Sequence, residues 1–498
     1  MERFIAAGWL TVLALLGLAA SAPGQEPASD LQMAAAMEKV LVDAIARSEK
    51  SVVAIARVRK ETPGEALHIE FHPDAFNRPP VLPSVPQPAD PNFIPNEYGT
   101  GVVVDRGGLI LTAYHVLGED SEYFVTTHDR KTFRAWIKAA DPRSDLAVLS
   151  IDAGTGGVGA SDFSPIALGD AAGLKKGQII ITLGNPYAIA RDGQVSAAWG
   201  IVANLARKAP PTPDDSDPSG KKTMHHFGTL IQTDAKLNLG TSGGPLLNLK
   251  GEMIGLCVSL AATAGYESSA GYAIPVDATF RRVLDVLKQG REVEYGFLGI
   301  GPTNLQPQEV LAGLQGMRVE RVVPGTPAAR DGGLLKSDDI ITAVDETPIY
   351  DSDGLVLEVG KLPVEAVSRL SVLRGGQKRI VEVKLSKYPV RGTKIVSTRP
   401  PAWRGMRTDY PTALVDNDPL GRAAPIFYED AVVVSEVEEG TPAWRAGVRR
   451  GMLIGQVQGI PVRTPKEFQT AVAGKSGAVE LRLVLGEPNQ VLTVPPGS

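Results

Sequence analysis

The sequence predicts a mainly β protein with an N-terminal β-barrel or β-sandwich domain and two smaller related modules. Short apolar segments recur between Gly- and Asp-containing turns in the first half of the chain, which favours an all-β domain over a βαβ fold. Residues 319–349 and 434–462 share one order of strand, Gly-Thr-Pro-Ala, short helix, glycine turn and strand. The length of 498 residues, 43% of them hydrophobic and 21% charged, allows roughly three globular domains.

The first 24 residues have the layout of a secretory signal peptide. Arg3 precedes a short apolar run that ends in small residues at 20–22, and we expect cleavage after Ala22 or after Gly24. An uncleaved membrane anchor is the alternative interpretation of this segment, and no other stretch is long and apolar enough to span a membrane. We therefore predict an exported protein of the periplasm or cell envelope that is soluble after signal cleavage.

Charge and cysteine content exclude several classes of protein. The formal net charge is −5 and no block of Lys and Arg resembles a nucleic-acid footprint, so nucleic acid is not an expected partner. The single cysteine, Cys257, excludes an intramolecular disulfide. Because Cys257 lies in an apolar run, we expect a buried structural thiol.

The N-terminal domain is expected to begin with a helix from about Asp30 and a strand over 51–58. Prolines recur from 63 to 96, which is incompatible with a regular ladder and predicts an exposed loop. Short strand candidates follow, and a helix over 276–290 closes the domain at a capping glycine. The strand candidates read GTGVVVD, LILTAYHVL, DLAVLSI, GQIIITLG, GQVSAAWGIVANL, TLIQTDA and EMIGLCVSL.

The segment GTSGGP, residues 240–245, surrounds Ser242 with glycines. Such density indicates a backbone that turns tightly or approaches another group closely. A hydrolytic serine needs a histidine to accept its proton, a carboxylate to orient the imidazole, and backbone N–H groups that face the oxyanion. His115 follows an apolar strand, Asp145 precedes the next one, and the amides of Gly240 and Ser242 can converge on one oxygen. The sequence therefore predicts a Ser-His-Asp site.

Each of these residues also has a purely structural interpretation. A serine between glycines is most often a turn, and a histidine after an apolar run is most often a packed or surface group. Asp141 competes with Asp145 for the acidic role, but Asp141 precedes a proline and reads as a turn, whereas Asp145 enters the strand directly. His225 and His226 suggest a metal site, yet they follow a polar loop with no cysteine nearby, so we expect a solvated loop there.

Five segments, in order, resemble the HtrA/Deg family of serine proteases, which have a trypsin-like double β-barrel followed by two PDZ domains. These segments are GTGVVVDRGGLILTAYHVL, DPRSDLAVLSI, ITLGNPYA, IQTDAKLNLGTSGGPLLNLKGEMIGL and GYAIPVD. The resemblance implies that His115 is the general base, Asp145 the orienting acid and Ser242 the nucleophile, with the amides of Gly240 and Ser242 as oxyanion donors.

The resemblance extends to the two repeats. YGFLGIG is similar to a PDZ carboxylate-binding loop, which implies that the amides of Leu298, Gly299 and Ile300 bind a peptide C-terminus. We find no equivalent loop for the second repeat in PIFYEDAVVV. The implied domains are a signal peptide at 1–24, the protease domain at 30–290, a first PDZ domain at 292–388, a linker at 389–405 and a second PDZ domain at 406–495.

The implied function is that of an ATP-independent serine endopeptidase of the cell envelope that degrades unfolded or misfolded proteins. Neither a metal nor an organic cofactor is implied. Expected partners are unfolded polypeptides, peptide C-termini at the first PDZ domain and further copies of the chain in a homotrimer or a larger homo-oligomer. The alternative is a proteolytically weak or silent HtrA-like chaperone or PDZ scaffold.

The loop before the predicted nucleophile departs from the family pattern. Where the family usually reads Asn-Pro-Gly-Asn, this chain has Leu239 and Thr241 on either side of Gly240. A proline that restricts the turn is lost and a β-branched residue stands beside the serine. We therefore expect a less rigid oxyanion loop, a low basal activity and gating of that activity by the PDZ domains.

Overall fold

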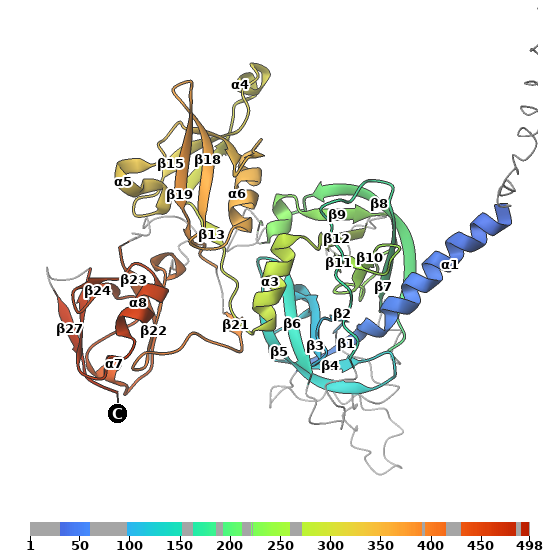
Figure 1. Ribbon diagram of the computed structural model, residues 1–498, viewed down its shortest axis with the longest axis horizontal. Coiled ribbons are helices and arrows are strands. Elements are labelled where there is room, and N and C mark those ends of the chain that lie inside the picture. Colours follow the sequence, from blue (N-terminus) through green and yellow to red (C-terminus); the bar gives the residue numbers. More distant parts are fainter. Residues whose placement is uncertain are drawn as a thin grey trace, which may run out of the picture.

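The structure is a computed structural model that describes residues 30–59, 97–151, 163–185, 193–211, 221, 223–258, 271–390, 394–414, 430–484 and 490–497. Two β-barrels form the N-terminal half, and two smaller sheet-and-helix domains follow them (Figure 1). The predicted mainly β fold is confirmed. The predicted signal peptide and the proline-rich segment 63–96 lie outside the described residues.

The first barrel is closed by six strands in the order β5-β4-β1-β2-β3-β6, because β6 pairs back onto β5. Apolar runs fill its interior. In β1, which follows the 3₁₀ turn at Glu49–Ser51, the first four residues are buried. The strands are β1 (Val52–Arg59), β2 (Glu97–Val103), β3 (Leu109–Ala113), β4 (Ser121–Thr126), β5 (Thr132–Asp141) and β6 (Leu146–Ile151).

The second barrel is closed by six strands in the order β10-β11-β12-β9-β8-β7. Its strand β8 is partly exposed along its length, whereas β11 is buried at every position. The strands are β7 (Ile179–Gly184), β8 (Ser196–Arg207), β9 (Leu230–Thr233), β10 (Pro245–Leu247), β11 (Met253–Val258) and β12 (Gly271–Pro275). One apolar core spans both barrels.

Two helices flank the barrels at the positions that the sequence predicts. Helix α1 (Asp30–Ser48) projects away from the barrels in Figure 1, and Ser48 near its end donates a hydrogen bond of 2.9 Å to the carbonyl of Gly251. Helix α3 (Ala278–Lys288) starts at Asp277, whose side chain accepts from the amide of Phe280, and it buries residues at positions i, i+3, i+4 and i+7. Within the described ranges, no helix has the length and apolar content needed to cross a membrane.

The first PDZ domain packs a six-strand sheet, in the order β14-β15-β16-β18-β19 with β17 paired to β16, around its own apolar core. Its elements are β13 (Gly296–Phe297), β14 (Ile300–Asn304), α4 (Pro307–Leu311), β15 (Met317–Val322), α5 (Arg330–Gly333), β16 (Ile340–Val344), β17 (Thr347–Pro348), α6 (Ser352–Lys361), β18 (Val367–Arg374), β19 (Gln377–Lys384) and β20 (Ser386–Lys387).

The second PDZ domain repeats this arrangement with the order β22-β23-β24-β26-β27 and a separate core. Its elements are β22 (Met406–Asp409), the 3₁₀ turn η8 (Pro411–Leu414), β23 (Val432–Val437), α7 (Pro442–Arg445), β24 (Leu453–Val457), β25 (Ile460–Pro461), α8 (Pro465–Val472), β26 (Val479–Leu483) and β27 (Val491–Val494).

Between the two PDZ domains the chain returns to the first barrel. Strand β21 (Ile395–Val396) pairs antiparallel with β5, so it extends the barrel sheet by one strand. The amide of Thr398 donates 2.9 Å to the carbonyl of Gly290, at the end of α3. The first PDZ domain is therefore inserted between two neighbouring attachment points on the two barrels.

A buried ammonium joins the parts of the chain around this point. Lys387, with 3% of its side chain exposed, has its Nζ 3.0 Å from Asp409, 3.0 Å from Glu294 and 3.1 Å from Glu292. Burial alone would lower the pKa of Lys387, but the three carboxylates raise it well above its usual value. Lys394 adds a second cation at 2.8 Å from Asp409.

Candidate active site

His115 and Asp145 form a hydrogen-bonded pair in the first barrel. His115 lies in the 3₁₀ turn η3 (Tyr114–Val116) that follows β3, and Asp145 immediately precedes β6. Nδ1 of His115 lies 2.8 Å from Oδ2 of Asp145, and the amide of His115 donates 3.0 Å to Oδ1 of the same carboxylate. Asp145 is buried, while 35% of the His115 side chain is exposed. The backbone bond fixes the carboxylate of Asp145, and the Nδ1 bond to that carboxylate orients the imidazole.

The two groups shift each other's pKa in the directions that a charge pair requires. Burial by itself lowers the pKa of His115, but the Asp145 carboxylate outweighs it, and the pKa ends above its usual value. Burial by itself raises the pKa of Asp145, but the imidazole charge and hydrogen bonds hold it below its usual range. The carboxylate therefore stays ionised near neutral pH and favours a cationic imidazole.

Ser242 is supplied by the second barrel, just before β10. Its side chain is buried to 6% exposure, and its carbonyl accepts a 2.9 Å bond from the amide of Thr100 on β2. Gly243 has φ +86°, and a Cβ placed on it would lie 2.1 Å from the carbonyl oxygen of Thr100. Both the dihedral and the close approach require glycine here. The dense glycine cluster thus brings a second-barrel loop onto a first-barrel strand.

The three predicted residues meet at this junction of the barrels. Gly99 shows their proximity, because a Cβ placed on it would lie 2.6 Å from Val116, the neighbour of His115, and 3.4 Å from the Ser242 carbonyl. Thr112, three residues before His115, also donates 2.8 Å to the carbonyl of Thr100. The structure therefore places the His115–Asp145 pair and the backbone of Ser242 beside the same strand, β2.

The predicted oxyanion loop before Ser242 is closed by bonds that the family resemblance did not indicate. The amide and the hydroxyl of Thr241 both donate to the carbonyl of Asn238, at 3.1 and 2.7 Å. Leu239 between them is 46% exposed. The β-branched residue that replaces the family's asparagine therefore supplies a hydroxyl that closes the turn, which partly replaces the restriction lost with the proline.

A buried threonine hydroxyl, not singled out from the sequence, ties this loop to the first barrel. Oγ1 of Thr100 donates 2.6 Å to the carbonyl of Gly240 and accepts 2.9 Å from the amide of Asn185. Thr100 is fully buried. Thr100 stands between two glycines in the first strand candidate. Its residue type alone does not show whether such a threonine only packs in the core or also positions a neighbouring loop.

The expectation of a solvated loop at His225 and His226 is wrong. Both lie in the 3₁₀ turn η6 (Met224–Phe227) and are only 3% and 8% exposed. Nε2 of His225 bonds the carbonyl of Ser144 at 3.0 Å, and Nδ1 bonds Oγ1 of Thr229 at 2.8 Å. Local polarity suggested a surface loop, whereas tertiary contacts bury the turn beside Asp145.

Two further residues behave as structural groups. Oδ2 of Asp141 accepts from the amide and the hydroxyl of Ser144, at 3.0 and 2.5 Å, so Asp141 stabilises the predicted turn. Cys257 is fully buried, and burial raises the pKa of its thiol to about 12. The thiol is therefore protonated and unreactive at neutral pH, as the expected structural thiol would be.

The predicted carboxylate loop of the first PDZ domain leads from β13 into the edge strand β14. The carbonyl of Gly299 accepts from the amide of Val323 at 2.9 Å, and that of Leu298 accepts from Ala328 at 3.0 Å. Thr326, from the Gly-Thr-Pro-Ala motif, donates 3.1 Å to the Gly299 carbonyl. The loop carbonyls are thus bonded to the segment 323–328, and the loop continues directly into the edge strand β14.

The second PDZ domain has a counterpart that the sequence comparison missed. There the carbonyl of Gly405 accepts from Glu438 at 2.8 Å, and that of Arg404 accepts from Ala443 at 3.1 Å. The counterpart loop is therefore WRGM, residues 403–406, which lies upstream of PIFYEDAVVV. It closes on itself, because the amide of Met406 donates 3.0 Å to the carbonyl of Trp403.

Comparisons with known proteins agree with this architecture. Residues 99–256 match the trypsin-like peptidase domain, and residues 296–385 and 433–485 each match a PDZ domain. The fold and the site thus define a trypsin-like serine protease with two PDZ domains.

The relatives specify the family. A DegP-like probable periplasmic serine endoprotease of Marinomonas sp. is 30% identical over 74% of this chain and 72% of its own. A protein of the same description from Pseudomonas fluorescens is 28% identical over 88% of this chain and 90% of its own. The periplasmic serine endoprotease DegP of Salmonella typhimurium is 28% identical over 78% and 74%. The chain belongs to the HtrA/Deg family of serine endopeptidases.

Proposed function

We propose that this endopeptidase degrades unfolded or misfolded proteins in the periplasm without ATP, using Ser242, His115 and Asp145. The observation that carries the site assignment is the His115–Asp145 pair, bonded at 2.8 Å beside the glycine-built loop of Ser242. The location and the substrate class are supported by the relatives, which are named periplasmic endoproteases.

In this mechanism Oγ of Ser242 attacks the peptide carbonyl while Nε2 of His115 takes the hydroxyl proton. Asp145 keeps Nδ1 protonated and stabilises the imidazolium that forms. The amides of Gly240 and Ser242 bind the oxyanion, and His115 returns the proton to the leaving amine. A water molecule, deprotonated by the same imidazole, then hydrolyses the acyl-enzyme.

Ser242→Ala tests the assignment. The variant should fold normally and lose degradation of casein and labelling by a fluorophosphonate, because it lacks the attacking oxygen. Degradation at the parent rate would refute the role of Ser242. A parent chain that neither cleaves casein nor reacts with the fluorophosphonate, yet suppresses aggregation of a denatured protein, would support the alternative chaperone or scaffold.

The first PDZ domain is proposed to bind peptide C-termini through the amides of Leu298, Gly299 and Ile300, and binding is proposed to raise proteolysis. The loop geometry supports this, since an extended peptide can add to the edge of β14 with its carboxylate at the loop. A free-acid peptide should bind the full chain and raise casein turnover, and its amidated version should do neither. Equal binding of both versions would remove the carboxylate role.

A homotrimer is proposed as the smallest assembly. Besides the family resemblance, helix α1 supports association, because Leu31 and Val42 are 79% and 56% exposed on it. Light scattering on the intact chain should give three times the monomer mass, and a chain lacking residues up to 41 should give less.

A further inference from the structure

The turn that carries Asp145 is held on one side by the second barrel. The carbonyl of Ser144 bonds His225 at 3.0 Å, and the carbonyl of Arg143 accepts a 2.8 Å bond from the amide of Met224. Asp145 itself has φ +56°, in the left-handed region that is uncommon for residues with a side chain, and the bonds of the two preceding residues hold the turn in this conformation. The position of Asp145 therefore depends on what surrounds the turn.

On the other side the turn is held by the first PDZ domain. The Arg143 guanidinium lies 3.7 Å from the ring centroid of Tyr388 and 5.3 Å from that of Tyr295. Tyr295 precedes β13 and Tyr388 follows β20, so the two rings come from the two ends of the domain. The hydroxyl of Tyr295 also donates to Oδ2 of Asp141, at the start of the turn.

Arg143 is enclosed in this position. It is 5% exposed, and an added Cβ on Gly360 of helix α6 would lie 2.8 Å from its Nη2. Its Nε has no hydrogen-bond partner among the described residues, and two aromatic faces together with the nearby Asp141 carboxylate stabilise the desolvated cation.

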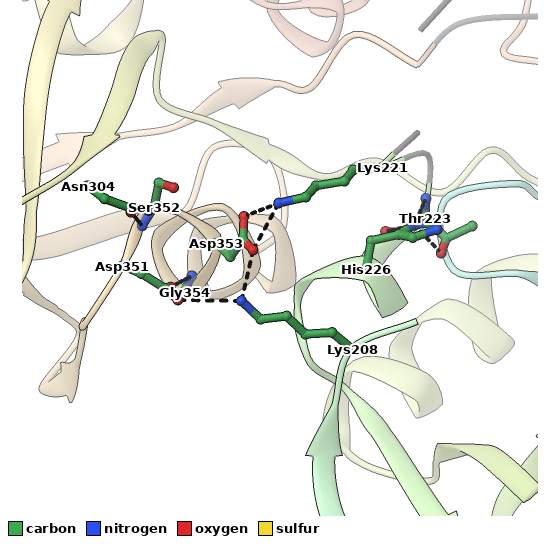
Figure 2. A network of polar contacts seen from close by, with 9 residues as sticks. All are labelled: Lys208, Lys221, Thr223, His226, Asn304, Asp351, Ser352, Asp353 and Gly354. Atoms are coloured by element: carbon green, nitrogen blue, oxygen red, sulfur yellow. Dashed lines mark hydrogen bonds and ion pairs between the residues drawn. The ribbon is translucent and has the colours of Figure 1, made fainter. Parts of the chain in front are cut away.

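Helix α6 is itself fixed to the second barrel, as Figure 2 shows. Nζ of Lys208, which follows β8, lies 2.8 Å from Oδ2 of Asp353, and Nζ of Lys221 lies 2.7 Å from Oδ1. Both lysines converge on one carboxylate in the first turn of α6. These ion pairs fix helix α6, and with it the space occupied by Arg143, relative to the second barrel.

Tyr388 also faces the carboxylate loop. Its ring packs edge-to-face on Phe297, with centroids 6.1 Å apart, and Phe297 immediately precedes Leu298. A continuous series of contacts therefore runs from the loop through Phe297, Tyr388 and Arg143 to the turn of Asp145.

We propose that Arg143 is a positioning residue of the reaction: held between Tyr295 and Tyr388, it makes the seating of the first PDZ domain hold Asp145 against His115. The inference rests on the proposed roles of His115, Asp145 and Ser242. When the contacts of Arg143 with the rings of Tyr295 and Tyr388 are lost, the turn relaxes and the bond between Asp145 and His115 is weakened. The imidazole then loses both its orientation and part of the charge stabilisation that favours its protonated form.

The test measures the rate of fluorophosphonate labelling of Ser242 in the full chain as a function of pH. This reaction needs neutral His115 but no bound peptide. Arg143→Met keeps the length of the side chain and removes the cation, and Arg379→Met makes the same change at an exposed site on β19. Arg143→Met should label roughly ten to a hundred times more slowly, and Arg379→Met should match the parent.

The pH dependence separates positioning from general damage to the fold. The titratable groups that face His115 and Asp145 include Tyr114, His225 and His226, and Asp141 lies on the same turn. With Asp145 displaced, the pKa of His115 falls, so the acid limb of the labelling profile should move to lower pH. Partial unfolding would reduce the labelled fraction and leave that limb unchanged.

Tyr388→Leu, which removes the ring face and keeps an apolar side chain, should reproduce both effects and serves if Arg143→Met fails to fold. Folded variants with the parent's rate and acid limb would overturn the positioning role. A parent chain that is not labelled at all would instead refute the proposed function, so the two failures are distinguishable.

Discussion

His225 is buried as a neutral imidazole, with a hydrogen bond on each ring nitrogen. Burial lowers its pKa, and the nearby Asp145 only partly compensates. Its folded pKa therefore lies below the unfolded value of about 6.5. As pH falls through 6.5, the unfolded chain takes up the proton before the folded chain does. The contribution to stability is complete above that pH and is lost progressively below it.

We predict that the melting temperature of the protein falls between pH 7 and pH 5, and that His225→Gln shows a shallower fall. The variant lacks the titrating imidazole but also loses a buried hydrogen bond, so it should be less stable at pH 8 by about 1–2 kcal/mol. Thermal unfolding across this pH range measures both effects. Parallel pH curves for parent and variant would show that His225 does not contribute to the acid sensitivity.

Strand β2 acts on the site through Thr100, whose amide and hydroxyl bond the loops around Ser242 and whose carbonyl accepts a bond from Thr112 on β3. The hydroxyl fixes the Gly240 carbonyl, and the amide fixes the Ser242 carbonyl. The element therefore sets the path of the oxyanion loop from the first barrel, although the loop belongs to the second.

Thr100→Val is predicted to lower kcat by roughly tenfold with little change in KM, because the loop loses one anchor while the shape of the core is kept. Thr100→Ser retains the hydroxyl and should keep most of the activity. Steady-state casein cleavage, normalised to the fluorophosphonate-reactive fraction, measures the pair. Equal loss in both variants would assign the effect to packing of the methyl group.

Elements with a strong local signal were predicted from the sequence, and those that depend on distant contacts were not. Helices α1 and α3 and strand β1 lie where the apolar periodicity and capping residues placed them. Strand β5 was missed because charged and exposed residues alternate with its buried ones, and β21 has only two residues, which the barrel edge pairs. Motif order was enough to propose the site residues, whereas the burial of His225 and the contacts around Arg143 arise from parts of the chain 80 to 245 residues away, which no local pattern records.

At the scale of the whole molecule, the buried Lys387 neutralises carboxylates that come from both PDZ domains. Glu292 and Glu294 lie at the start of the first domain, and Asp409 belongs to the second. Removing the ammonium would leave these carboxylates facing one another in a buried place, which is costly.

Lys387→Met is therefore predicted to weaken the docking of the second PDZ domain by about 3–5 kcal/mol. Lys394→Met, at a cation that is 39% exposed, should cost much less. Calorimetry should show an earlier, separate transition for Lys387→Met, and limited proteolysis should cut that variant faster between the PDZ domains. A single unchanged transition in both variants would contradict a joining role for Lys387.

Because the chain returns to the first barrel after the first PDZ domain, the N-terminal domain does not end at residue 290. Because β21 pairs with β5 and Thr398 bonds Gly290, both ends of the first PDZ domain are anchored next to each other. The domain is a cassette, which could be excised and replaced by a short bridge from 290 to 395 without breaking the sheet. A chain cut after 388 would lose the second PDZ domain and also the strand that β21 adds to the first barrel, so the activity of such a fragment would report on a barrel whose strand β5 lacks that partner.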